Sequence, residues 1–252
     1  MKKNIKWLAI LIAGFTLSTN AATLTWNGYN WLMDGAGDPI VINAASVESN
    51  GYFAGGNVMI ASGSGIGTNN HLIIDAADVL SGTGSSMFSI GSNIGRNNNT
   101  VELTNGATVS VAGYLILGSS GSTGNRLILG EDSTFKTSTY FLSYNGNIVE
   151  FAGGTVRVGT DLRLYTNSEI VVSGDYAAGE TLLSWNSIDS GASYLNTAEK
   201  ILAAFNAGGS GYEFGLGADG KSIQVIPEPA AALMLAGVAG LVGFYRRFFC
   251  KL

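Results

Sequence analysis

The chain has few of the residues that cross-link proteins, hold metals or carry acid–base chemistry. Among 252 residues there are one cysteine (Cys250), one histidine (His71) and three prolines, and only 12% of the residues are charged. A single cysteine excludes an intramolecular disulfide, and a single histidine excludes a multi-histidine zinc site. We therefore expect no metal and no other cofactor. Stability must come from an apolar core and from backbone hydrogen bonds.

Basic residues are also scarce over most of the chain. Between Ala22 and Val225 there are seven lysines and arginines against 17 acidic residues, a net charge of −10. An acidic segment of this kind is a poor candidate for binding nucleic acid, so we expect no nucleic-acid partner. Glycine, by contrast, is abundant, with 36 residues in the whole chain.

The N-terminus has the pattern of a secretory signal peptide. A basic start of three lysines (Lys2, Lys3 and Lys6) precedes the apolar run Trp7–Leu17. Small residues follow, with Thr19 and Ala21 at the two positions that a signal peptidase inspects. We predict a signal peptide over 1–21, cleaved after Ala21 or, alternatively, after Ala22. An uncleaved anchor is disfavoured because the apolar run is short for a membrane span.

The C-terminus combines three features: the motif Pro227-Glu228-Pro229, an apolar stretch over 230–245, and the pair Arg246-Arg247. Proline cannot continue a helix or a central strand, so the motif should be extended and accessible. A helix over 230–245 would be about 24 Å long, somewhat short for a hydrocarbon core of about 30 Å. Snorkelling arginines, which favour the cytoplasmic side, make a transmembrane helix feasible.

This tripartite tail resembles the PEP-CTERM sorting signal of Gram-negative bacteria. The departures are mild: Ala230 stands where Ser or Thr often follows, and Ile226 where Val is usual. The resemblance implies export through the inner membrane, transient anchoring there, processing by an exosortase, and a final place at the cell surface or outside the cell. It also implies a setting of extracellular polysaccharide. The alternative is a plain stop-transfer anchor.

The segment between the two signals contains degenerate repeats. Five segments begin with an asparagine followed by alternating apolar residues: Asn70, Asn99, Asn125, Asn147 and, less regularly, Asn167. Each is followed by further short alternating stretches with glycine-rich turns between them. Alternation with period two indicates strands with one buried face. It places Val101, Leu103, Val109, Val111, Leu115 and Leu117 inside, and Glu102, Ser110 and Ile116 outside.

Three short strands per repeat predict an all-β solenoid, a right-handed parallel β-helix in which neighbouring coils bury a common core. The recurring asparagines should stack as a ladder at one corner. The architecture is similar to autotransporter-like passenger domains. The alternative is an antiparallel β-sandwich or β-roll, because strand spacing does not fix strand direction.

The repeats divide the chain into five regions. After the signal peptide (1–21) come an N-terminal cap with the first strands (22–69), in which Trp26, Tyr29 and Trp31 could cover the first coil, and the solenoid repeats (70–185). A C-terminal cap (186–225) follows, with a helix over 197–207 and a hairpin around Ala218-Asp219-Gly220. The last region, 226–252, is the sorting signal.

Two sets of side chains are candidates for function on the exported segment. Tyr114, Tyr140, Tyr144 and Tyr165 fall at or beside the third strand of successive repeats, where they could present rings to a glycan or simply pack on each other. Arg157, Asp161 and Arg163 are the nearest approach to a catalytic cluster, although a surface ion pair explains them as well.

Two classes of function remain. The first is a non-enzymatic, surface-delivered structural or adhesive protein associated with extracellular polysaccharide or biofilm matrix. The second is a carbohydrate-active enzyme, a lyase or hydrolase, built on a β-helix; fold analogy alone gives it little support. We predict no enzymatic activity, with exosortase and signal peptidase as partners during export.

Overall fold

A computed structural model describes residues 23–26, 31–34, 39–43, 57–61, 67–81, 86–208 and 211–226. Ala21 and Ala22 of the predicted cleavage site, and residues 227–252 with the sorting signal and the predicted transmembrane helix, lie outside the described residues. No helix in the described part of the chain is long and apolar enough to cross a membrane.

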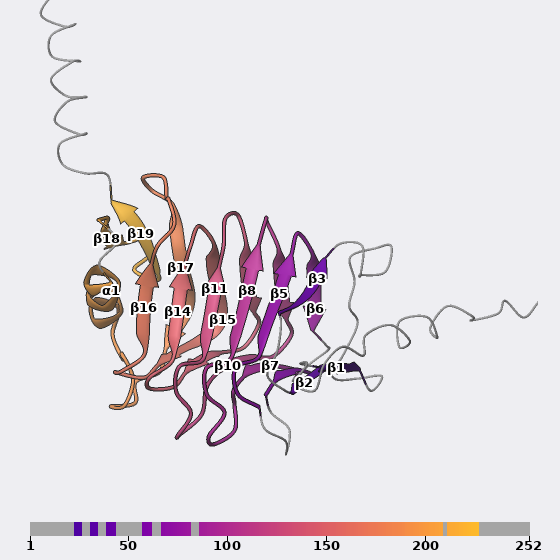
Figure 1. Cartoon of the computed structure of the whole chain (residues 1–252). Coiled ribbons are helices and arrows are strands. Elements are labelled where there is room, and N and C mark those ends of the chain that lie inside the picture. Colours follow the sequence, from indigo (N-terminus) through magenta and orange to yellow (C-terminus); the bar gives the residue numbers. More distant parts are fainter. Residues whose placement is uncertain are drawn as a thin grey trace, which may run out of the picture.

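The described residues form a three-faced parallel β-solenoid of about five coils (Figure 1). The first face is a six-stranded sheet made of β3 (Ile40–Asn43), β5 (His71–Asp75), β8 (Thr100–Thr104), β11 (Arg126–Leu129), β14 (Ile148–Phe151) and β16 (Glu169–Val172). The second face consists of β6 (Asp78–Ser81), β9 (Thr108–Val111), β12 (Thr134–Thr137) and the first parts of β15 (Thr155–Leu164) and β17 (Thr181–Ile188), whose last residues pair with each other on the third face.

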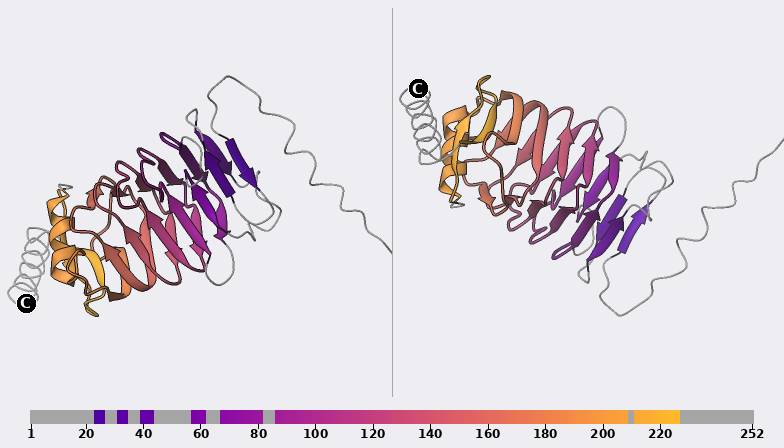
Figure 2. Two further views of the ribbon diagram at one scale, coloured as in Figure 1. Left: turned by 90° about the horizontal axis from the view of Figure 1, so that it is seen from below. Right: turned by 90° about the horizontal axis from the view of Figure 1, so that it is seen from above.

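The third face contains β2 (Trp31–Asp34), β4 (Val58–Ile60), β7 (Met87–Ile90), β10 (Tyr114–Leu117), β13 (Phe141–Ser143) and the last part of β15. Because β15 runs without interruption from the second face to the third, these two faces belong to one 13-stranded sheet. The strands of successive coils lie side by side along the axis of the solenoid (Figure 2).

Strand direction decides between the two predicted folds. Within each face, successive coils pair in parallel and in register, as Val101, Leu127 and Val149 do on β8, β11 and β14. Paired strands in the described residues are antiparallel only near the two ends, in β1 (Thr23–Trp26) with β2 and in the pairs that β19 (Ser222–Ile226) makes. The predicted parallel solenoid is therefore confirmed over the β-sandwich or β-roll, while its right-handedness stays a prediction.

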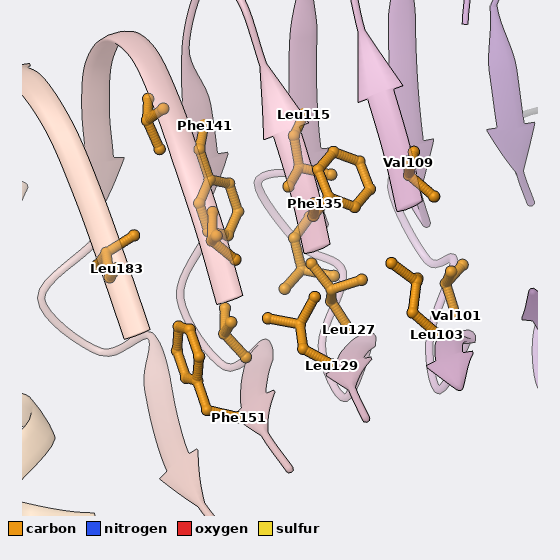
Figure 3. Packing of buried hydrophobic residues seen from close by; sticks show 14 of the residues in the cluster. Val101, Leu103, Val109, Leu115, Leu127, Leu129, Phe135, Phe141, Phe151 and Leu183 are labelled. Carbon is orange, nitrogen blue, oxygen red and sulfur yellow. The ribbon is translucent and has the colours of Figure 1, made fainter. Parts of the chain in front are cut away.

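The core lies along the axis and is apolar. The six residues predicted to be buried in the coil of β8, β9 and β10 are at most 2% exposed: Val101, Leu103, Val109, Val111, Leu115 and Leu117. Glu102, Ser110 and Ile116 alternate with them and are partly exposed, so the predicted register is confirmed. Aromatic rings such as Phe135, Phe141 and Phe151 fill the interior as well (Figure 3). Phe135 makes an edge-to-face contact with Phe88, with ring centroids 5.1 Å apart.

A helix and a hairpin close the C-terminal end of the solenoid (Figure 1). The helix α1 (Ala198–Ala207) begins one residue later than predicted, because Thr197 is extended (φ −140°) and caps it by accepting a hydrogen bond from the backbone N–H of Lys200. Phe205 of α1 is fully buried and contacts Phe151 of the last coils at 5.1 Å between ring centroids. The hairpin pairs β18 (Glu213–Leu216) with β19, around the predicted turn.

The opposite end begins with the antiparallel pair of β1 and β2, in which Trp26 and Trp31 are register partners. Both belong to the predicted N-terminal cap, whereas Tyr29 lies outside the described residues. The chain thus builds the solenoid from β1 toward α1, and the last described strand, β19, ends at Ile226, directly before Pro227.

Candidate functional site

The predicted asparagine ladder exists at the corner between the third and first faces. Asn70, Asn99, Asn125 and Asn147 are each at most 1% exposed. Each Nδ2 donates to Oδ1 of the next member, at 2.7 Å from Asn70 to Asn99 and at 2.8 Å for the two later steps. The same Oδ1 atoms also accept from the backbone N–H of the preceding asparagine at 3.1 Å. The ladder therefore ties four coils together inside the protein.

Asn167 does not belong to the ladder, so this part of the predicted repeat alignment is wrong by one residue. Glu169 pairs with Ile148, which aligns Ser168 with Asn147. Asn167 is exposed, while the buried hydroxyl of Ser168 donates to the carbonyl oxygen of Ser143 at 2.9 Å. The alignment was wrong because Asn167 has the expected residue type but lies one position too early. The shorter Ser168 occupies the corner position that is equivalent to Asn147.

Glycines make room for the ladder. Gly91 and Gly118 occupy equivalent positions at the ends of β7 and β10, and both have positive φ (62° and 78°). A Cβ at Gly91 would lie 2.3 Å from Oδ1 of Asn125, and one at Gly118 would lie 2.2 Å from Nδ2 of Asn147. In the next coil Tyr144 takes the place of the glycine. The residue aligned with Asn147 in the following coil is the smaller Ser168.

The four candidate tyrosines lie on the third face as two separate stacks. Tyr114 and Tyr140 stack with ring centroids 4.4 Å apart, and Tyr144 and Tyr165 with centroids 4.9 Å apart. The two pairs stand at opposite ends of the short strands of this face, because Tyr140 precedes β13 and Tyr144 follows it. The four rings therefore form two stacks that flank the strands of this face.

Much of the ring surface in these stacks is covered by neighbouring side chains. The guanidinium of Arg163 lies 4.6 Å from the centroid of the Tyr140 ring, and Tyr194 contacts Tyr165 edge-on at 4.8 Å. Burial raises the pKa of Tyr140 and of Tyr144 above that of a free phenol. The geometry is that of rings that pack on one another and on their neighbours.

Arg157, Asp161 and Arg163 all lie on β15, and only two of them are brought together. Nη2 of Arg163 is 3.2 Å from Oδ2 of Asp161, and its Nε is 3.1 Å from Asp189, although without hydrogen-bond geometry. Arg157 lies on the other half of the strand, on the second face. Arg157 is exposed and Arg163 is partly exposed, so the two arginines point outward from two halves of one continuous strand.

Sequence reasoning did not identify two side-chain contacts between coils on the first face, a hydrogen bond of His71 with Glu102 and an ion pair of Arg126 with Glu150. Nε2 of His71 is 3.1 Å from Oε2 of Glu102 in the next coil, and Nη2 of Arg126 is 2.5 Å from Oε2 of Glu150. Both pairs join a first strand position to the outward position two residues on in the neighbouring coil. The parallel register would reveal them once the coils are aligned. Each fastens two coils together.

The described residues include no group of three or more His, Cys, Asp or Glu side chains that could hold a metal ion. The charged groups of these pairs face each other, within one strand for Asp161 and Arg163 and between neighbouring coils for Arg126 and Glu150.

Comparison with known proteins adds the final element. The fold of the described residues is a parallel β-solenoid. At its end, residues 225–247 match the PEP-CTERM protein-sorting motif, so the chain carries that signal. PEP-CTERM proteins are exported and sorted to the cell surface, and the motif implies processing by exosortase. No curated protein and no solved structure matches the chain.

Proposed function

We propose that this protein is a non-enzymatic structural or adhesive component of the cell surface, delivered by its sorting motif and associated with extracellular polysaccharide or biofilm matrix. The observation that carries the proposal is the direct junction of solenoid and signal. The motif match begins at Val225, inside β19, and the described fold ends at Ile226. Removal of the chain beyond Pro229 would therefore leave every described strand in place.

A structural role also fits the way the coils are held together. The asparagine ladder, the tyrosine stacks and the ion pair of the first face all join neighbouring coils through side chains, in addition to the backbone pairing. Because these contacts join each coil to the next, we expect the solenoid to be stiff along its axis. A rod of stacked coils offers long faces for repeated weak contacts with a polymer.

The arrangement of charged groups supports the non-enzymatic part of the proposal. A lyase or hydrolase needs an acid and a base within reach of one reacting atom. Asp161 and Arg163 are instead paired with each other, and the Asp161 carboxylate also accepts a hydrogen bond from the hydroxyl of Ser187. The guanidinium of Arg163 thus contacts Asp161, Asp189 and the ring of Tyr140, and these contacts occupy it within the protein.

The proposal is tested in the producing bacterium by comparing a wild-type strain with one that lacks its exosortase. We expect the protein at the cell surface and in the extracted matrix of the first strain, and retained in the inner membrane of the second. A chain with Pro227→Ala and Pro229→Ala should be retained in the same way. Surface delivery that is equal in the two strains would contradict processing by exosortase.

A further inference from the structure

Two cations stand side by side on the second face. Lys136 of β12 and Arg157 of β15 are register partners on neighbouring parallel strands, and both side chains are exposed. Such positions are about 4.8 Å apart along the axis, and like charges at this spacing repel each other. Within the part of the chain that the structure describes, no carboxylate forms an ion pair with either, whereas Arg126 and Arg163 have such partners.

Beside Arg157 the second face meets the C-terminal hairpin in a shallow depression of about 350 Å³. Polar side chains line it, among them Thr155, Thr181, Ser184, Ser222 and Gln224. Asp219 is the one carboxylate in this lining, and its Oδ1 accepts hydrogen bonds from the backbone N–H of Lys221 and from the hydroxyl of Ser222. The depression thus offers hydroxyl and amide groups next to an arginine.

We propose that Lys136, Arg157 and the adjoining depression bind the carboxylate groups of an acidic polysaccharide. The inference rests on the proposed function and names the class of polymer. A guanidinium can hold a carboxylate through two parallel hydrogen bonds, with the lysine as a second positive charge one coil away. The partly exposed side chains of Thr155, Thr181, Ser184 and Gln224 would meet the hydroxyl groups of the sugar, whereas Ser222 is buried against Asp219.

The net charge of the exported segment makes this location selective. With a balance of −10, most of the segment's charge repels a polyanion, so attraction is favoured at Lys136 and Arg157, two adjacent cations with no ion pair to a carboxylate among the described residues. A nucleic acid needs many phosphate contacts to gain useful affinity, and two cations supply few. A polymer that combines carboxylates with hydroxyl groups fits the site better.

The test measures binding of polygalacturonate to the full-length chain, purified in an uncharged detergent, by surface plasmon resonance at low and moderate salt. Replacing Lys136→Gln and Arg157→Gln together should weaken binding by about tenfold or more, because charge-assisted hydrogen bonds are lost. The matched control is Lys200→Gln, which removes one exposed positive charge on α1, at the same end of the solenoid but outside the lining of the depression. We expect that control to bind as the wild type does.

Three results would overturn the inference: unchanged binding by the double variant, equal binding of the fully methyl-esterified polymer, or equally tight binding of single-stranded DNA. Thermal unfolding of each variant shows whether it is folded. Should the double variant fail to fold, Arg157→Lys, which keeps the charge but removes the planar fork, takes its place and should weaken binding by a smaller factor. Surface delivery is measured separately, so a protein that is delivered but does not bind refutes this inference alone.

Discussion

Gly118 and Asn147 fit together with no room for one additional methyl group: a Cβ at Gly118 would lie 2.2 Å from Nδ2 of Asn147. Gly118 also has a φ of 78°, a backbone conformation that residues other than glycine rarely adopt. The glycine therefore serves two purposes, a turn at the end of β10 and space for the asparagine ladder. In the next coil Tyr144 stands at the position of Gly118, opposite Ser168 instead of an asparagine.

Gly118→Ala should destabilise the protein through both strain and collision. The matched control is Gly106→Ala, at a glycine of nearly the same φ (75°) with nothing within 4 Å of its added Cβ. We expect about 1 kcal/mol for the control, from the backbone conformation alone, and a clearly larger loss for Gly118→Ala. Urea unfolding measures both. Equal losses of unfolding free energy in the two variants would mean that a methyl group at Gly118 does not collide with the asparagine ladder.

Asn125→Ala should be among the most harmful single changes in the chain. It removes the Oδ1 that accepts from Nδ2 and from the backbone N–H of Asn99, and it removes one of the two donors to Oδ1 of Asn147. Buried polar groups left without partners cost about 1–3 kcal/mol each. Asn167→Ala, which removes an exposed side chain outside the ladder, should change the free energy of unfolding by no more than about 0.5 kcal/mol. A similar effect of the two variants would dismiss the ladder as a source of stability.

Leu117→Ala should cost about 2–5 kcal/mol, because the side chain is fully buried at the centre of the core. Its neighbour Ile116 points to the outer side of the same strand and is partly exposed. Ile116→Ala should therefore be markedly milder. Chemical denaturation of the two variants compares the faces directly, and a reversed order would place the strand in the other register.

Stability should fall at alkaline pH because of the tyrosines. Burial raises the pKa of Tyr176, whose hydroxyl donates to the carbonyl oxygen of Gly154 at 3.0 Å and accepts from the N–H of Gly153 at 2.9 Å. Since the folded pKa exceeds the value of 10.0 for a free phenol, the contribution is complete below pH 10 and is lost as the pH rises above it. Tyr140 and Tyr144 act in the same direction.

The measurement is the free energy of unfolding between about pH 8 and pH 11, together with phenol absorbance of the folded protein. Tyr176→Phe should lower stability at neutral pH, because the backbone groups of Gly153 and Gly154 lose their partner, and should flatten the decline above pH 10. If the unfolding free energy of Tyr176→Phe falls as steeply above pH 10 as that of the wild type, residues other than Tyr176 cause the loss of stability.

The sequence allowed the solenoid to be predicted because its signals are local. Alternation fixes which side of each strand is buried, and glycine marks the corners, so the register of Val101 and Leu103 followed directly. Contacts between coils depend on alignment across gaps of unequal length. For this reason the alignment was wrong by one residue at Asn167, and the hydrogen bond between His71 and Glu102 was missed.

The tyrosines show a further limit of sequence reasoning. Their spacing placed them on one face, but whether rings stack or spread depends on neighbours from other coils. Arg163 reaches Tyr140 from the next coil, and Tyr194 reaches Tyr165 from the segment before α1. Neither contact is encoded in a local pattern. The pair of Lys136 and Arg157 likewise emerges only when β12 and β15 are placed side by side.

The most direct test of the account is the mass of the mature protein recovered from the cell surface. Intact mass and peptide mapping should give a chain that begins at Ala22 or close to it and contains no peptide from 230–252. The described solenoid, through Ile226, should be complete. A surface protein that still contains Arg246 would contradict exosortase processing and leave residues 226–252 as a plain membrane anchor.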